Sequence, residues 1–480
     1  MKKYILIILC CLTSFPLWSY NVNMIVEHYS VDQGLPNNTV NCTLKDRDGF
    51  IWFGTWYGLC CFDGVKFKTF NKQEHDSDVP PRKIQRIVED KNGYIWVKTI
   101  DRKLYVFNKV TECFHAVYDD MKNYSENIQV IKLQNTAEGD VLLLTKDKNL
   151  LLAGVDEKGQ VTIKILFDSR NEINKHDYTL KHHVLCETEE YISWIGTDYK
   201  VAAVHKGSEL ASRPADFITS KINSGDKDSF TSFFEDGRKV WVGDRAGIFY
   251  SIDVRTGLVN RYVLSEIKGA ISNLLVTPAG YVYLSVAGQG TYEYDLAERR
   301  LQKINTEMND AMVTHAFIDQ YDKIWFHENE KALIYYDPLN HTAKRFPFTM
   351  FGKITTLYSE DAGERGLFFL SPAGEAWLFD REHAEMVYIN KLKQLSNDRA
   401  NQQFYHLMLD NDGVLWLSSA DEGVYCMNFP KKQFNLLSLS PQSVGQENYA
   451  TGVRAFSNQK VAISGWAPVG RVFIGWTGTV

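Results

Sequence analysis

One phrase recurs along the chain at a nearly constant spacing, and this repeat limits the possible folds more than any other feature. Its clearest copies are residues 46–55 (DRDGFIWFGT) and residues 90–99 (DKNGYIWVKT). In both, a tight turn with Asp and Gly leads into a strand that is rich in aromatic and β-branched residues. Tryptophan occupies the central position of the phrase six times, at Trp52, Trp96, Trp194, Trp241, Trp325 and Trp416.

Three weaker copies of the phrase carry another apolar residue in place of Trp, at Leu142, Tyr283 and Phe369. The nine positions from Trp52 to Trp416 are then separated by 42–52 residues. A period of about 40–50 residues is that of a four-stranded β-propeller blade, and no helical apolar periodicity accompanies it. The sequence therefore predicts an all-β propeller of four-stranded antiparallel blades.

The first copy also has the local pattern of one blade. Residues 39–44, 50–55, 59–62 and 65–70 favour strands, separated by turns that contain Gly or Asp-Gly. A twisted sheet of this size cannot bury both faces alone, so a large ring on each central strand is expected to pack on the next blade. We therefore interpret the six tryptophans as structural blade anchors, outside any binding site.

Counting blades predicts the domain boundaries. Seven anchors precede residue 345, so we expect a seven-bladed propeller over residues 21–345. The first two to three blades of a second, incomplete propeller follow over residues 346–480. Closure leaves two alternatives: residues 24–30 complete the seventh blade, or residues 343–349 supply its outer strand and the N-terminal strand joins another propeller.

The N-terminal residues 1–20 have the pattern of a signal peptide. Lys2 and Lys3 precede an apolar run that reaches about Leu17, with Ser19 at a fair cleavage position. The alternative is an uncleaved membrane anchor, and no later segment has the apolar length of a membrane-spanning helix. The mature protein is therefore expected outside the cytoplasm, in the periplasm. Six cysteines remain after the signal, with no metal-ligand spacing, and are expected to be buried thiols.

Charge and motifs exclude several classes of function. The formal net charge is −6 and the basic residues are scattered, which argues against nucleic acid as a partner. The chain carries no Gly-x-Ser-x-Gly, His-Glu-x-x-His or phosphate-binding glycine loop. We therefore predict no catalytic residues, no metal site and no cofactor.

The repeat phrases resemble the two-component regulator propeller repeat, which forms the periplasmic half of hybrid two-component sensors, notably in Bacteroidetes. Residues 28–40 (HYSVDQGLPNNTV) look like the start of that family's first repeat, and the resemblance extends to about residue 475. It implies a sensor that recognises a glycan fragment and regulates genes for its use. Family members continue into a membrane helix, a kinase and a DNA-binding module. This sequence ends at Val480 without them, so we expect a truncated, non-enzymatic sensor region that meets the membrane only through missing parts or an uncleaved signal.

Loops that follow the central strands converge on one face of a propeller and are the predicted ligand site. Aromatic rings stack on sugars, while Asp, Arg and Gln form hydrogen bonds with hydroxyl groups. The expected partner is therefore a small oligosaccharide, and a homodimer is left open. The candidate residues in these loops are Trp56, Tyr57, Asp101, Arg102, Tyr199, Asp244, Arg245 and Gln289.

Two other hypotheses remain open from the sequence. A propeller lyase or hydrolase that acts on a polysaccharide would use the same loops for catalysis. A non-catalytic interaction scaffold would have no small ligand. Turnover of a glycan would favour the enzyme, and the absence of any response to glycans would favour the scaffold.

Overall fold

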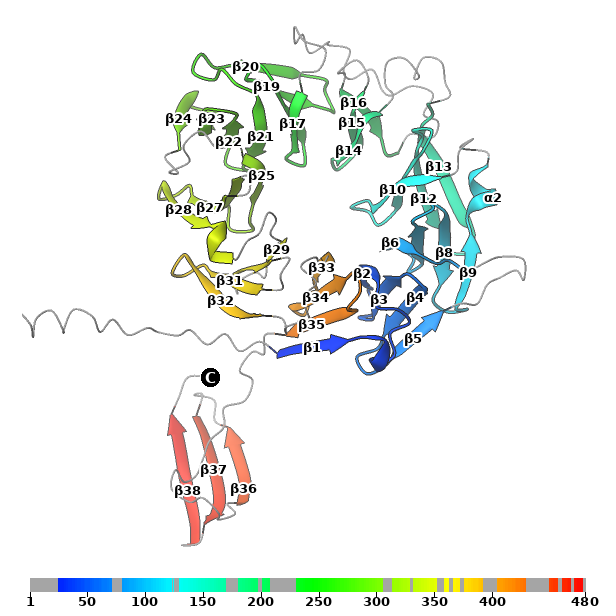
Figure 1. The fold of residues 1–480 in the computed structure, drawn as a ribbon, viewed down its shortest axis with the longest axis vertical. Coiled ribbons are helices and arrows are strands. Elements are labelled where there is room, and N and C mark those ends of the chain that lie inside the picture. Colours follow the sequence, from blue (N-terminus) through cyan, green and yellow to red (C-terminus); the bar gives the residue numbers. More distant parts are fainter. Residues whose placement is uncertain are drawn as a thin grey trace, which may run out of the picture. The chain divides into compact units, whose positions relative to one another are not determined.

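In the computed structural model, the regular secondary structure of the described residues is almost entirely β-strand, as predicted (Figure 1). It describes residues 25–70, 80–122, 124, 129–169, 180–196, 201–207, 230–304, 313–328, 331–351, 358–361, 366–371, 375–391, 404–428, 449–455, 460–467 and 470–477. Within this part lie one short α-helix, α2 (Tyr118–Met121), and two 3-10 helices, η1 (Val31–Gln33) and η3 (Phe348–Phe351). None of the described helices has the length and apolar character needed to cross a lipid bilayer.

The first sheet illustrates the repeating unit. It contains β2 (Val40–Lys45), β3 (Ile51–Thr55), β4 (Gly58–Phe62) and β5 (Phe67–Phe70), hydrogen-bonded in chain order and antiparallel throughout. The Asp-Gly turn after β2 uses the positive φ of Gly49, 92°. A sheet of this kind is one propeller blade.

Further sheets repeat the same order along the chain. The second sheet comprises β6 (Ile84–Glu89), β7 (Ile95–Thr99), β8 (Leu104–Asn108) and β9 (Cys113–Ala116). The third comprises β10 (Val130–Asn135), β11 (Val141–Thr145), β12 (Leu150–Val155) and β13 (Val161–Phe167). The fourth comprises β14 (Leu180–Glu187), β15 (Tyr191–Gly196) and β16 (Val201–His205). The fifth and sixth comprise β17 (Phe230–Glu235), β18 (Lys239–Asp244), β19 (Ile248–Asp253) and β20 (Val259–Val263); and β21 (Ile271–Val276), β22 (Tyr281–Val286), β23 (Gly290–Asp295) and β24 (Arg300–Lys303). The seventh and eighth comprise β25 (Val313–Ile318), β26 (Ile324–Glu328), β27 (Ala332–Asp337) and β28 (Thr342–Pro347); and β29 (Tyr358–Asp361), β30 (Leu367–Leu370), β31 (Glu375–Asp380) and β32 (Glu385–Lys391). The ninth combines β33 (Phe404–Leu409), β34 (Val414–Ser419) and β35 (Val424–Asn428) with the N-terminal β1 (Ile25–Tyr29).

Apolar clusters join each sheet to the next. On β3, Trp52 belongs to the cluster shared with the second sheet, whereas Ile51 and Phe53 belong to the cluster shared with the ninth. Successive strand residues point to opposite faces, so one central strand contributes to both clusters. Within the described residues, nine such clusters link the nine sheets, and the ninth cluster joins the last sheet to the first. The sheets of this unit therefore close into a ring (Figure 1).

The aspartate that begins the repeat phrase accepts a hydrogen bond from the indole N–H of the tryptophan that follows it, six residues later in four copies. Asp46 Oδ1 accepts hydrogen bonds from the backbone N–H groups of Asp48 and Phe50, and its Oδ2 accepts the indole N–H of Trp52 at 2.8 Å. The same arrangement holds Trp96, Trp325 and Trp416 through Asp90, Asp319 and Asp410. Asp236 holds Trp241 in the same way at a spacing of five residues. One carboxylate thus fixes both the turn and the orientation of the core ring. All six predicted anchor tryptophans are buried.

The innermost strand of most sheets contains a β-bulge near its start. The register shifts between Val40 and Cys42, between Ile84 and Arg86, and between Phe404 and His406. Cys42, Arg86 and His406 therefore hold equivalent positions on the innermost strands of three neighbouring sheets.

The N-terminal strand completes the ninth sheet. β1 pairs antiparallel with β35 over five residues, from Ile25 opposite Asn428 to Tyr29 opposite Val424. The outer edge of the seventh sheet is already occupied by β28, which pairs with β27. The outer strand of the seventh sheet therefore comes from β28, as in the second alternative, but the N-terminal strand closes the ninth sheet of the same ring and does not join another propeller.

This pairing changes the predicted ring size. The prediction of seven blades per ring is not confirmed. The ring contains nine sheets within the described residues, because β1 pairs with β35 of the ninth sheet and not with a strand of the seventh. The predicted division after residue 345 also differs from the structure, in which the first compact unit continues to Phe429.

The second unit, residues 430–480, contains one described antiparallel sheet of β36 (Tyr449–Ala455), β37 (Lys460–Ala467) and β38 (Gly470–Thr477). Its first strand has a register shift between Ala450 and Gly452, where the innermost strands of the ring carry their bulges. The backbone of this sheet therefore follows the blade pattern.

The cysteines behave as the sequence predicts where they are described. Cys42, Cys60, Cys61, Cys113 and Cys426 are free, buried thiols. Burial raises the pKa of the Cys42 thiol to about 12, so it is protonated at neutral pH. The environment of Cys186 lies outside the described part of the chain.

Candidate ligand-binding face

The loop between β3 and β4 presents two aromatic side chains to solvent. The Thr55 hydroxyl donates to the carbonyl of Gly58 at 2.8 Å and accepts the N–H of Tyr57, which fixes a tight turn. Trp56 and Tyr57 lie at the tip of this turn and are 38% and 61% exposed. Exposed neighbouring rings of this kind offer apolar faces for stacking.

Backbone hydrogen bonds connect this loop to the adjacent blade. The N–H of Lys83 donates to the carbonyl of Trp56, and the N–H of Ile100 donates to the carbonyl of Lys83, each at 2.9 Å. The Lys83 ammonium lies 5.2 Å from the centre of the Trp56 ring, a cation–π contact. We call Trp56, Tyr57, Lys83, Ile100 and Arg102 the loop surface.

A pocket of about 410 Å³ opens beside Arg102. Its floor is apolar, because Leu104, Val117 and Met121 are buried there. Its lining also contains the polar or amphipathic side chains of Asp101, Arg102, Lys103, Tyr118 and Gln129. An apolar floor with a few polar groups around it is the usual character of a small-molecule site.

The charges at this pocket are positioned by local contacts. Asp101 accepts a hydrogen bond from the Thr99 hydroxyl at 2.5 Å and forms an ion pair with Lys103 at 3.3 Å. Partial burial raises the pKa of Asp101, but these two partners outweigh it and the pKa is lowered overall. The backbone of Arg102 has a φ of 66°, and its carbonyl accepts the N–H of Val130 at the start of the third sheet. The pocket therefore presents a carboxylate and a guanidinium side by side.

A family model described as two component regulator propeller matches residues 34–57. This stretch contains the turn before β2, the Asp46–Trp52 hydrogen bond and the exposed Trp56–Tyr57 pair. The chain contains a two-component regulator propeller repeat. Within the described residues, the sheets of the ring share the antiparallel order of the first sheet, except that the fourth has three strands and the ninth takes its outer strand from β1.

Solved propeller structures are similar to the chain at low identity. The extracellular domain of a hybrid two component system from B. thetaiotaomicron is 16% identical, with a TM-score of 0.34, over 95% of this chain and 60% of that one. The extracellular domain of a one component system from the same organism is 17% identical, with a TM-score of 0.30, over 92% and 60%. The Dos1 propeller is 12% identical, with a TM-score of 0.43, over 84% and 93%.

The chain spans about 60% of the length of the two B. thetaiotaomicron structures. No curated protein sequence matches it.

The structure places four of the eight predicted ligand residues together. Trp56 and Tyr57 follow the central strand β3 of the first sheet, and Asp101 and Arg102 follow the central strand β7 of the second sheet. Hydrogen bonds through Lys83 join the two loops.

The other predicted residues lie elsewhere. Arg245 is exposed in the turn after β18, and Tyr199 lies outside the described residues. Gln289 accepts the N–H of Lys268 and donates to the carbonyl of Glu266, so its amide already secures the strand connection.

Asp244 corrects the expectation that these loop residues are exposed. It ends β18, is fully buried, and accepts the N–H groups of Ala246 and Ile248 through Oδ1. These hydrogen bonds make Asp244 part of the turn structure, and burial raises its pKa. The sequence could not separate it from an exposed Asp because the turn hydrogen bonds depend on the backbone path.

Several residues of this face were not predicted from the sequence, among them Lys83, Gln129, Tyr118 and Met121. Lys83 and Gln129 precede inner strands, and Tyr118 and Met121 belong to α2. The available signal for Lys83 and Gln129 was their position directly before the innermost strands β6 and β10. Nothing in the repeat phrase predicted α2.

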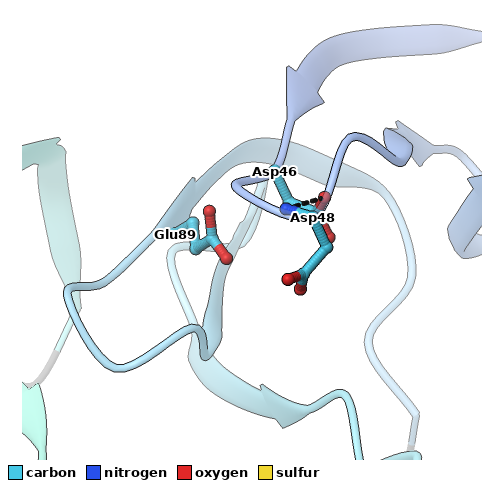
Figure 2. A group of neighbouring side chains, drawn as sticks. All are labelled: Asp46, Asp48 and Glu89. Atoms are coloured by element: carbon cyan, nitrogen blue, oxygen red, sulfur yellow. Dashed lines mark hydrogen bonds between the residues drawn. The ribbon is translucent and has the colours of Figure 1, made fainter.

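Asp46, Asp48 and Glu89 bring three carboxylates together between the first two propeller repeats (Figure 2). The ammonium of Lys109 lies 3.1, 2.6 and 2.8 Å from oxygens of Asp46, Asp48 and Glu89. Burial lowers the pKa of Lys109, but hydrogen bonds to the three carboxylates outweigh this and raise it. Lys109 therefore takes the position that a metal ion would need, and the cluster joins two blades through ion pairs.

Changing Lys109 to Met tests this assignment. The variant should lose roughly 2–4 kcal/mol of unfolding free energy, because it leaves a buried carboxylate without its cation. Lys68→Met removes an exposed ion pair with Glu112 and should cost under about 1 kcal/mol. Urea unfolding measures both, with and without EDTA. A loss of wild-type stability in EDTA would contradict the ion-pair assignment.

Proposed function

We propose that this chain is the periplasmic ligand-sensing region of a hybrid two-component sensor, and that it recognises a glycan-derived oligosaccharide at the loop surface. The observation that carries the proposal is the exposed Trp56–Tyr57 pair linked to a pocket with Asp101 and Arg102. The propeller repeat over residues 34–57 supports the sensor class, because its family is named for two component regulators.

The chemistry of the loop surface suits a sugar. Pyranose rings present apolar C–H faces that stack on aromatic rings, and their hydroxyl groups bind planar carboxylate and guanidinium groups in pairs. The cation–π contact of Lys83 orients the Trp56 ring without covering it, since 38% of Trp56 remains exposed. An apolar pocket floor next to these groups gives a second sugar unit a place to bind.

Calorimetric titration of the purified protein with a panel of neutral and acidic oligosaccharides tests the proposal. One family of glycans should bind, and Trp56→Ala should raise its Kd about tenfold, equivalent to about 1.4 kcal/mol of lost stacking. Tyr388→Ala is a matched control, because Tyr388 is an exposed aromatic residue on the eighth sheet. It should leave the Kd unchanged.

Two outcomes count against the proposal. If no oligosaccharide binds, or if Trp56→Ala binds like the wild type, the loop surface is not the ligand site. Analysis of the sugars after long incubation addresses the enzyme alternative. Cleaved products that disappear in a Tyr57→Phe or Asp101→Asn variant would assign catalysis to these loops instead.

A further inference from the structure

A second pocket lies at the inner edge of the ring, and none of its lining residues belongs to the loop surface. It has a volume of about 390 Å³ and is lined by residues of the innermost strands β2, β6, β10 and β33. Its charged or polar lining includes Lys45, Arg86, Glu89, Asn135 and His406. We call it the inner-edge pocket.

Two of these charges are already neutralised. Lys45 forms ion pairs with Asp410, at 3.4 Å, and with Asp412. Glu89 forms ion pairs with Arg47 at 3.2 Å and with Lys109 at 2.8 Å. Neither group has a charge to spare for a ligand.

Arg86 is different. No carboxylate lies within ion-pair distance of its guanidinium in the part of the chain that the structure describes, and the side chain is exposed to the pocket. It is directly opposite Lys98 across the β6–β7 ladder. Like charges in directly opposite positions of a sheet are destabilising.

Lys98 does not relieve this excess of positive charge. It is only 6% exposed, and its ammonium donates to two neutral oxygens, the Gln85 side-chain carbonyl and the Ile131 backbone carbonyl, each at 2.7 Å. Burial, and then Arg102 and Arg86, lower the pKa of Lys98. Arg86 and Lys98 are therefore two neighbouring cations, and the ammonium of Lys98 has only neutral hydrogen-bond acceptors.

The His406 ring adds an unused polar atom. Its Nδ1 is buried and has no hydrogen-bond partner among the described residues. Burial, and then Arg86, lower the pKa of His406 to about 4, so the ring is neutral at pH 7 and can carry its proton on Nδ1 as a donor. His406 and Arg86 hold equivalent positions after the bulges of their strands, which directs both to the inner-edge pocket.

We propose that the inner-edge pocket binds an oxyanion, a carboxylate or a sulfate group, through the guanidinium of Arg86 and a hydrogen bond from His406. Arg86 supplies the charge, and Asn135 lies at the rim as a further polar partner. The group belongs to an acidic sugar or to a free inorganic anion. This proposal does not rest on the loop surface, because none of its residues belongs to that face.

The experiment compares anions on the full chain by thermal unfolding. Sodium sulfate is compared with sodium chloride at equal ionic strength, and D-glucuronate with D-glucose. Sulfate stabilises proteins generally. For each anion, the shift in unfolding temperature of Arg86→Gln is therefore subtracted from that of the wild type. We expect a saturable difference for sulfate and for glucuronate, and none for chloride or glucose. A response to sulfate alone would assign the site to a free anion, and a response to glucuronate would assign it to an acidic sugar.

Arg86→Gln should weaken binding by about tenfold or more, because a charge-assisted hydrogen bond is lost. Without anions the same variant should be at least as stable as the wild type, since its repulsion with Lys98 is removed. Arg82→Gln, a change of an exposed arginine outside the pocket, should bind like the wild type. Trp56→Ala should also keep the anion response, which separates this proposal from that for the loop surface. Identical anion curves for wild type and Arg86→Gln would overturn the proposal.

Discussion

Replacing Glu27 with cysteine should produce a disulfide with Cys426 under mild oxidation, and the bond should stabilise the protein by several kcal/mol. The two residues are direct partners in the β1–β35 ladder, and Cys426 is a free thiol. Antiparallel partners have the Cα separation that a disulfide requires. The bond would close nearly the whole first unit into one loop, for which the chain-entropy relation gives on the order of 5 kcal/mol.

Burial, and then the Glu27 carboxylate, raise the pKa of the Cys426 thiol to about 12. Glu27→Cys removes that carboxylate, and treatment with the two-electron oxidant diamide at alkaline pH, where a larger fraction of the thiol is the reactive thiolate, forms the bond. Peptide mapping by mass spectrometry identifies the bond, and urea unfolding with and without reductant measures its effect. The double variant Glu27→Cys with Cys426→Ser is the control and should show neither.

This disulfide also decides the size of the ring. If the N-terminal strand closed the seventh sheet beside β27, position 27 would be far from Cys426 in the fold and no intramolecular bond could form. A surface thiol that is fully oxidised under the same conditions shows that the oxidant was sufficient. If the protein then stays monomeric and lacks the disulfide, the nine-sheet ring is contradicted.

Replacing Asp90 with alanine should cost roughly 3–5 kcal/mol of unfolding free energy. Asp90 is 1% exposed and accepts four hydrogen bonds. Its Oδ1 binds the N–H groups of Asn92 and Tyr94, and its Oδ2 binds the Trp96 indole at 2.9 Å and the N–H of Val155 at 3.2 Å. Alanine would leave these donors buried without an acceptor, and Val155 belongs to the next sheet, so the change weakens both the turn and the blade interface.

Thermal and urea unfolding measure the loss, and near-UV circular dichroism reports the packing of the Trp96 ring. The matched control is Asp140→Ala, which removes an ion pair with Lys91 between the same two sheets. That pair is partly exposed to solvent, so its removal should cost under about 1 kcal/mol. Equal losses for Asp90→Ala and Asp140→Ala would show that the Asp90 hydrogen bonds do not hold the blade.

Local features of the sequence predicted the blades well. Turn residues such as Gly49 and strand composition act within a few residues, so a repeat of 42–52 residues was enough to find the central strands from Trp52 to Trp416. The burial of these tryptophans follows from the same logic, because a ring on a central strand has only the adjacent blade to pack on. The partner of the indole N–H, the first Asp of the phrase, was not foreseen, although the two residues are six apart in four copies and five apart in another.

The candidate site was predicted only in part. Trp56 and Tyr57 were found because two adjacent aromatic residues in a turn cannot both be buried, and both are exposed. The burial of Asp244 and the use of the Gln289 amide by backbone groups depend on chain segments that come together only in the fold. The same is true of the inner-edge pocket, whose Arg86 and His406 are brought together by two bulges on different blades.

The sequence by itself determined the blade as the building unit, because its strands pair with their neighbours through short turns. The tertiary structure alone decided how many blades the ring contains. Ring closure depends on which sheet edge β1 pairs with. The outer edge of the seventh sheet is formed by β28, and β1 pairs with β35 of the ninth sheet. A strand of five residues carries no local signal for a partner that lies at the far end of the unit, so only the assembled ring specifies it.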